Sequence, residues 1–124
     1  MQDIDKIVSE FTLKDRKEMA MDIAAFVEKF NNDEVILVDI RMPFETAVWG
    51  VKFALEIPYN KLPEKLKELP KDKIIVCACP NEYRSNMAKE YLRFKGLNAK
   101  SLNGGLLGLM EYLKGGKAKD IKLK

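Results

Sequence analysis

The hydrophobic positions of this chain fall into short uninterrupted runs that are separated by segments with helical periodicity. Two of the runs, residues 34–40 and 73–79, are rich in β-branched side chains, which is typical of strands buried on both faces. Shorter apolar runs predict two more strands, at residues 54–58 and 98–102. Uninterrupted apolar strands of this kind indicate a parallel sheet that helices cover on both sides.

Helical periodicity occupies the segments between these strands. One amphipathic helix is predicted over residues 15–30, where four apolar residues share one face: Met19, Ile23, Phe26 and Phe30. Later helices are predicted at residues 62–69, 85–95 and 106–114. The sequence therefore predicts an α/β fold with a central, mostly parallel β-sheet and helices on both faces. In such a fold the ligand lies at the carboxyl ends of the strands, in loops that lead into helices.

Composition fits one globular domain over residues 1–124. The chain is 47% hydrophobic and 33% charged, with a formal net charge of +3. The lysine-rich tail, residues 114–124, is expected to be a solvated end, and a weak electrostatic docking patch is the alternative. The sequence lacks the concentrated basic stripe of a nucleic-acid binder. No apolar run approaches the length of a membrane span, and the acidic N-terminus lacks the apolar core of a signal peptide. We therefore expect a cytoplasmic protein with neither a nucleic acid nor a membrane as its partner.

The chain contains two cysteines and no histidine, which limits its chemistry. Ser-His-Asp triads and Cys-His pairs are excluded, and so is any mechanism that needs an imidazole base. Two cysteines without histidine also argue against a zinc site or a disulfide framework. We expect no metal and no cofactor.

The candidate chemistry lies in the segment CPNEYRS, residues 79–85, between the second buried strand and the helix that follows it. At such a position the helix N-terminus and the loop N–H groups favour a thiolate and can bind an anion. Arg84 adds a permanent cation with a planar set of donors. Ser85 is expected mainly to cap the helix, with Asn86 as the other candidate, and secondarily to hydrogen-bond the loop.

Spacing from Arg84 distinguishes the two cysteines. Cys79 gives C-x4-R and Cys77 gives C-x6-R, so neither matches the C-x5-R loop of the protein tyrosine phosphatases. The segment CPNEYRS resembles instead the loop C-x-x-G-x-R-S of the rhodanese sulfurtransferases. The resemblance runs from about residue 34 to residue 113 and includes VILVDIRMPFE, ALEIPYNKL, LPKDKIIVCAC and RSNMAKEYLRFKGLNAKSLNGGLLGL. The chain is identified as a single-domain member of the rhodanese-like family, with an N-terminal helical extension over about residues 1–30.

The resemblance implies a sulfurtransferase whose catalytic residues are Cys79, the nucleophile, and Arg84. In such an enzyme Cys79 accepts sulfane sulfur from a donor, which is thiosulfate or a protein persulfide. It carries the sulfur as a persulfide and passes it to a thiophilic acceptor, which can itself be a protein. Arg84 and the loop N–H groups hold the anionic donor. The substrate-binding loop consists of Pro80, Asn81, Glu82, Tyr83, Arg84 and Ser85.

Three features depart from the family pattern. The first is Glu82, which replaces the loop glycine. If its carboxylate points inward, it repels an anionic donor and raises the pKa of the Cys79 thiol. If the carboxylate points outward, it is solvated or contacts a partner. The element GHIPGA is here WGVKFA, without the histidine, and we expect Trp49 to form a half-buried hydrophobic ledge rather than to stack on a substrate. Leu109 replaces an aromatic residue, which we interpret as a change in packing.

The charged residues at the end of the first buried strand and the other cysteine, Cys77, each have two possible roles. Asp39, Arg41 and Glu45 are interpreted as a structural ion network, and a contact with the active loop is the alternative. Cys77 is expected to point to the same side of the strand as Cys79, with Cα atoms about 6.6 Å apart, and to be a core residue. Its alternative role is that of a resolving thiol that attacks the persulfide or sulfenate of Cys79, which requires the strand to bend.

Other classes of function compete with sulfur transfer. Glu82 and the missing loop glycine suggest a non-catalytic rhodanese-like module that binds or regulates a partner. A phosphatase or an arsenate-reductase-like enzyme shares the thiolate and arginine, but the C-x4-R loop is too short to wrap a phosphate. A thiol–disulfide oxidoreductase built on Cys77 and Cys79 ranks last.

Overall fold

The computed structural model describes residues 4–123, in which helices and strands alternate. Its strands are β1 (Ala20–Met21), β2 (Val35–Asp39), β3 (Ala54–Glu56), β4 (Ile74–Ala78) and β5 (Ala99–Leu102). Its α-helices are α1 (Ile4–Ser9), α2 (Leu13–Glu18), α3 (Ile23–Asn31), α4 (Pro43–Thr46), α5 (Leu62–Lys65), α6 (Tyr83–Phe94) and α7 (Gly105–Leu113). Its 3₁₀ helices are η1 (Tyr59–Lys61), η2 (Leu66–Glu68) and η3 (Gly115–Asp120). None of the helices in this part of the chain is long and apolar enough to cross a membrane.

The five described strands form one sheet in the order β1-β5-β4-β2-β3, and every pair is parallel. This arrangement confirms the predicted α/β class. In the register of the two central strands, Asp39 of β2 lies beside Ala78 of β4. Because parallel strands end at the same edge of a sheet, the residues that follow them, among them Cys79, meet at this carboxyl edge.

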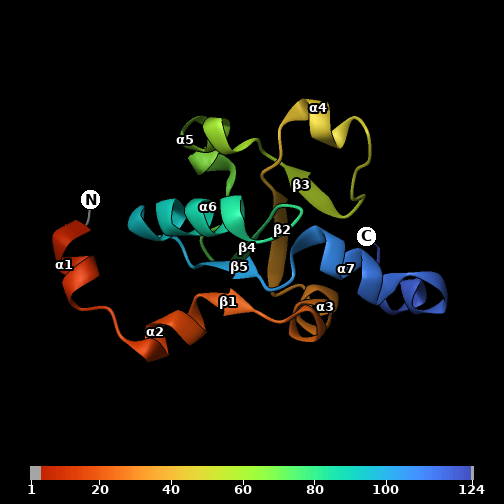
Figure 1. The fold of residues 1–124 in the computed structure, drawn as a ribbon, viewed down its shortest axis with the longest axis horizontal. Coiled ribbons are helices and arrows are strands. Elements are labelled where there is room, and N and C mark those ends of the chain that lie inside the picture. The colour runs from red at the N-terminus through yellow and green to blue at the C-terminus, as the bar shows by residue number, and fades with distance from the viewer. Residues whose placement is uncertain (1–3, 124) are drawn as a thin grey trace.

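Two hydrophobic cores, one on each face of the sheet, hold the helices. The first joins the sheet to α3 and α7, and the second joins it to α5 and α6. Leu37 belongs to the first core and its neighbour Val38 to the second, since the side chains of a strand alternate between faces. Figure 1 shows α5 and α6 on one side of the sheet and α3 on the other. Burial on both faces explains why the strands appear in the sequence as uninterrupted apolar runs.

The single helix predicted over residues 15–30 is wrong. The chain forms α2, then the short edge strand β1, and then α3, so the helix is interrupted where the sheet begins. The backbone nitrogens of Ser101 and Asn103 donate to the carbonyl oxygens of Met19 and Met21, each at 2.9 Å. Met19 and Phe26 are both buried, which is why their spacing imitated one helical face. Pairing with a distant strand therefore overrode the local helical pattern.

Candidate active site

Cys79 directly follows β4 and is almost completely buried, with 2% of its surface exposed. Its Sγ accepts the backbone N–H of Ser85 at 3.3 Å and donates to the carbonyl oxygen of Asn81 at 3.3 Å. Ser85 is the third residue of α6, so its N–H is one of those that the helix itself leaves unpaired. The sulfur thus lies at the positive end of a 12-residue helix, which favours negative charge on it.

The start of α7 packs directly against the Cys79 loop. The N–H groups of Leu106 and Leu107 donate to the carbonyl oxygens of Cys79 and Pro80, at 2.8 and 3.2 Å. Gly105 has φ +65°, and a Cβ at this position would lie within 2.7 Å of three loop carbonyl oxygens. Only glycine fits there. No role was predicted for Gly105 from the sequence, although two consecutive glycines before a helix are a signal of close backbone approach.

The same contacts decide where the loop N–H groups point. The carbonyl groups of Pro80 and Asn81 face α7. Because the N–H of a trans peptide points opposite to its C=O, the N–H groups of Asn81 and Glu82 face away from α7. Pro80 has no N–H to contribute. The part of the loop before α6 therefore offers fewer donors than its length suggests.

Arg84 is held by Glu45 of α4 through two hydrogen bonds, of 2.6 and 2.8 Å. The carboxylate also accepts the N–H of Met42 at 3.0 Å. The hydrogen bond from Arg84, and to a smaller extent the one from Met42, lowers the pKa of Glu45 to about 2. The carboxylate in turn raises the pKa of Arg84. Instead of one network with Asp39 and Arg41, the structure places Glu45 at the active loop. The guanidinium is therefore already paired with an anion.

Asp39 and Arg41 form a second, buried ion pair behind the first. Two guanidinium nitrogens of Arg41 donate to the Asp39 carboxylate, at 3.0 and 2.8 Å. The guanidinium carbon also lies 3.8 Å from the centroid of the Trp49 ring, and Nη2 donates to the Trp49 carbonyl oxygen at 3.1 Å. The half-buried Trp49 thus covers the ion pair and packs against the first core. The pair braces the segment between β2 and β3, on which Glu45 is carried.

Ser85 does not occupy the helix-cap position expected of it, whereas Glu82 takes the outward, exposed orientation, one of the two that the sequence left open. The helix begins at Tyr83, with Glu82 as the residue before it, so the prediction that Ser85 or Asn86 caps the helix is wrong. The backbone N–H of Ser85 is instead bound to the Cys79 sulfur, and its hydroxyl donates to the Glu82 carbonyl oxygen at 3.2 Å. The Glu82 side chain is exposed. Ser85 therefore connects the loop to the helix from inside the first turn.

Cys77 lies in the core on the same face of the sheet as Cys79, as expected, and both are free thiols. It is fully buried, and burial raises the pKa of its thiol to about 12. Leu109, which stands at the aromatic position, is also fully buried and belongs to the first core. These two residues contribute packing to the site.

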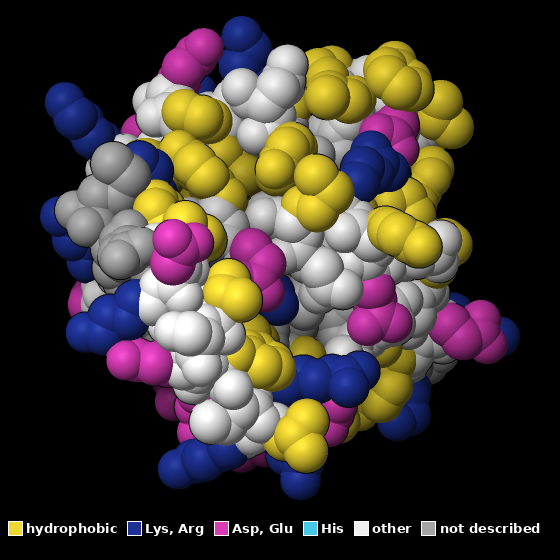
Figure 2. Space-filling view, turned by 60° about the vertical axis from the view of Figure 1, so that its left-hand side comes forward, with side chains coloured by type: hydrophobic (Ala, Val, Ile, Leu, Met, Phe, Trp, Pro, Cys, Tyr) yellow, Lys and Arg dark blue, Asp and Glu magenta, His cyan; other side chains and the backbone are white. Residues whose placement is uncertain are grey.

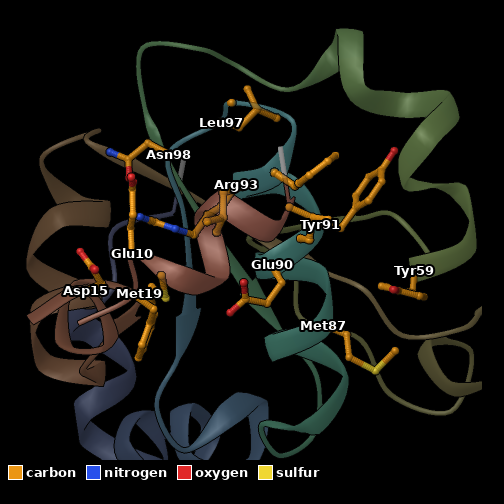
Figure 3. Close-up of a pocket in the computed structure, with 15 residues that line it drawn as sticks. Glu10, Asp15, Met19, Tyr59, Met87, Glu90, Tyr91, Arg93, Leu97 and Asn98 are labelled. Carbon is orange, nitrogen blue, oxygen red and sulfur yellow. The ribbon is translucent and has the colours of Figure 1, made fainter. Parts of the chain in front are cut away.

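A cavity of about 840 Å³ lies along α6, and none of residues 79–85 lines it. Figure 3 shows Glu10 and Asp15 of the N-terminal segment on one side of this cavity and Met87 and Tyr91 of α6 on the other. In Figure 2, which brings the α1 side of the molecule forward, hydrophobic side chains gather on the surface with acidic side chains among them. The sequence gives no indication of this cavity, because its walls come from segments far apart in the chain.

Comparison with known proteins identifies the family that combines this parallel sheet with a cysteine loop leading into a helix. Residues 22–111 match the family described as Rhodanese-like domain. The chain therefore belongs to the rhodanese-like domain family, which confirms the resemblance. The match begins before residue 34, where the resemblance starts, and so includes α3.

Individual relatives agree with this assignment. A protein named Sulfurtransferase from Allochromatium vinosum is 36% identical over 78 residues, which are 62% of this chain and 73% of that protein. The putative sulfurtransferase YtwF of Bacillus subtilis is 34% identical over 85 residues, 68% of this chain and 82% of that protein. The crystal structure of a rhodanese-related protein from Thermoplasma volcanium matches with a TM-score of 0.66 and 30% identity, over 74% of this chain and 90% of that one.

Proposed function

We propose that this protein is a sulfurtransferase that carries sulfane sulfur as a persulfide on Cys79. The observation that carries the proposal is the position of the Cys79 sulfur, which accepts the N–H of Ser85 at the N-terminal end of α6. Negative charge on sulfur is stabilised there without a histidine base. Membership of the rhodanese-like family and the sulfurtransferase names of the two relatives support the same class of reaction.

The proposed reaction consists of two displacements at sulfur. The Cys79 thiolate attacks the outer sulfur of the donor, and the leaving group departs with the electron pair of the broken bond. The leaving group is sulfite when the donor is thiosulfate and a thiolate when the donor is a persulfide. An acceptor thiolate then attacks the terminal sulfur of the Cys79 persulfide and releases the Cys79 thiolate. Neither step needs an external oxidant or reductant.

The remaining loop residues have binding roles in this proposal. The N–H of Ser85 stabilises the charge on Cys79. The Asn81 carbonyl oxygen accepts the Cys79 thiol, so the N–H of Glu82, in the same trans peptide, points away from the sulfur. Arg84 can bind an anionic donor in two ways. Its guanidinium either contacts the donor and Glu45 at the same time, or breaks its hydrogen bonds to Glu45. A donor with little net charge therefore suits the site better than the thiosulfate dianion.

Intact mass measurement tests the proposal. The protein is incubated separately with thiosulfate and with glutathione persulfide, desalted and weighed. We expect a gain of the mass of one sulfur atom, which dithiothreitol removes. The gain is absent from Cys79→Ser and is retained by the matched variant Cys77→Ala. Folded protein that gains no sulfur from either donor would contradict the proposal.

A further inference from the structure

Four large apolar side chains border the Cys79 loop and are exposed, and we call them the apolar rim: Phe44, Val48, Tyr83 and Leu107. Their exposed fractions are 74%, 81%, 90% and 52%, respectively. Single exposed apolar residues are ordinary on a protein surface. Several of them around one buried nucleophile are typical of a surface that another molecule covers.

Backbone and side-chain contacts place the rim beside the loop. The rim residue of α7, Leu107, donates its N–H to the Pro80 carbonyl oxygen at 3.2 Å. The rim residue of α6, Tyr83, is the first residue of that helix. The other two lie on either side of Glu45, whose carboxylate holds Arg84. Figure 1 shows α4, the start of α6 and the start of α7 on different sides of the loop that follows β4. The rim therefore comes from three elements that converge on one cysteine.

The carboxyl edge of the sheet is acidic, although the chain as a whole carries a formal net charge of +3. The carboxylates at this edge that are not buried belong to Glu45, Glu56 and Glu82, and to Asp22, which lines a pocket together with Arg16, Lys17, Lys29 and Lys100; Asp39 is buried and paired with Arg41. Arg84 lies among them and is already paired with Glu45, and Lys61 is paired with Glu64 at 3.6 Å. Glu82 is exposed, and its side chain has no hydrogen bond or ion pair within residues 4–123. A molecule that approaches Cys79 therefore meets the negative charge of Glu82, which no basic residue of this part of the chain neutralises by direct contact.

We propose that the apolar rim docks a protein partner in sulfur transfer, and that this partner presents its cysteine on a segment with apolar and basic residues. The inference rests on the proposed function and adds the kind of partner. Apolar side chains of the segment cover the rim, and a lysine or arginine meets Glu82, so that shape and charge are both complementary. The negative edge disfavours a small dianion, and it equally disfavours an anionic membrane surface.

Two synthetic peptides test this docking surface, each with one cysteine activated as a mixed disulfide with thionitrobenzoate. One peptide has leucine and lysine on both sides of the cysteine, and the other has serine and glutamate. In Cys77→Ala protein, the Cys79 thiolate attacks the peptide sulfur and thionitrobenzoate leaves, so its absorbance gives the rate of exchange. We expect the leucine-lysine peptide to react about tenfold faster at low ionic strength.

Matched variants locate the preference on the surface. The rim variant carries three substitutions, Phe44→Ser, Val48→Ser and Leu107→Ser, and is expected to lose the preference for the leucine-lysine peptide. The control variant carries Val8→Ser and Leu13→Ser, which change exposed apolar residues of the N-terminal segment, and is expected to keep this preference. Both variants are expected to react normally with the small neutral disulfide dithiodipyridine, which shows that the Cys79 loop is intact.

Several outcomes would overturn the docking surface. Equal rates for the two peptides would do so, and so would a preference that survives in the rim variant. A dimer, or binding to phosphatidylcholine vesicles, that the rim variant loses would assign the rim to a second copy of the chain or to a membrane instead. Failure of the proposed function has a different signature, because the protein then takes up no sulfur from either donor while the peptide preference, which needs only thiol–disulfide exchange, is kept.

Discussion

At the scale of single residues, the carboxylate of Glu45 determines how much charge the active loop offers. Folding lowers its pKa from 4.5 to about 2, chiefly through the bond from Arg84. Between these values the folded protein keeps the carboxylate charged while the unfolded chain binds a proton. The stabilisation from this group is therefore present in full above pH 4.5 and is lost as the pH falls through about 2.

We predict that Glu45→Gln lowers the melting temperature at neutral pH and that the difference from wild type shrinks as the pH falls from 4.5 towards 2. Circular dichroism melts over this range give the measurement. Glu64→Gln is the matched control, since its pair with Lys61 is exposed and such pairs contribute little. A difference between Glu45→Gln and wild type that stays constant with pH would rule out the ion pair as its source.

The two cysteines are predicted to differ completely in reactivity. Burial raises the pKa of Cys77 to about 12, so at neutral pH it is a protonated thiol without access to solvent. We expect iodoacetamide to add one group to the native protein and two groups in denaturant, and none to native Cys79→Ser. Mass spectrometry of the labelled peptides gives the site. Rapid labelling of Cys77 in the native protein would instead support the resolving-thiol and oxidoreductase alternatives.

At the scale of elements, the contact between α7 and the Cys79 loop is the feature that shapes the site. The first N–H groups of α7 have no partners within their own helix, and they donate to the loop carbonyl groups. This contact requires the backbone to approach so closely that Gly105 cannot carry a side chain. The position of the loop N–H groups therefore depends on one glycine in the following βα unit.

We predict that Gly105→Ala displaces the loop and abolishes sulfur uptake by Cys79, because the new Cβ overlaps with three carbonyl oxygens. Gly115→Ala is the matched control: Gly115 also has φ +65°, but a Cβ there has no neighbour within 4 Å. It is expected to cost only the backbone strain of about 1 kcal/mol and to retain sulfur uptake. Urea unfolding and intact mass measure the two effects. Equal losses in both variants would attribute the effect to backbone strain and not to the loop contact.

The elements that the sequence predicts correctly are those whose cause is local. The runs at 34–40 and 73–79 are apolar because both faces are buried, and this cause is visible in a few adjacent letters. The helix over 15–30 failed because Met19 bonds to Ser101, far along the chain. In the site, the spacing of Cys79 from Arg84 identified the loop, but the partner of Arg84 lies 39 residues away on α4. Such pairings depend on the three-dimensional structure and leave no periodic signal.

At the scale of the whole molecule, the N-terminal segment divides at Met19 into parts with different roles. The helices α1 and α2 contribute no buried residue, and both precede the family match, which begins at residue 22. Figure 1 shows them to one side of the sheet. The strand β1 directly after them pairs with β5 and buries Met21 in the first core. The edge of the sheet is thus completed by residues from outside the resemblance that starts at residue 34.

We predict that a chain beginning at Met19 keeps its stability within about 1 kcal/mol and keeps sulfur uptake, because neither core loses a side chain. A chain beginning at residue 23 is the comparison. It loses the buried Met19 and Met21 and is expected to be about 3 kcal/mol less stable or worse. Its uncovered β5 edge is also expected to promote association between chains. Urea unfolding and size-exclusion chromatography measure both effects. If the two truncations lower the free energy of unfolding by the same amount, the prediction is wrong and α1 and α2 belong to the cooperative fold. The contacts along the cavity beside α6 would then contribute more to stability than their burial indicates.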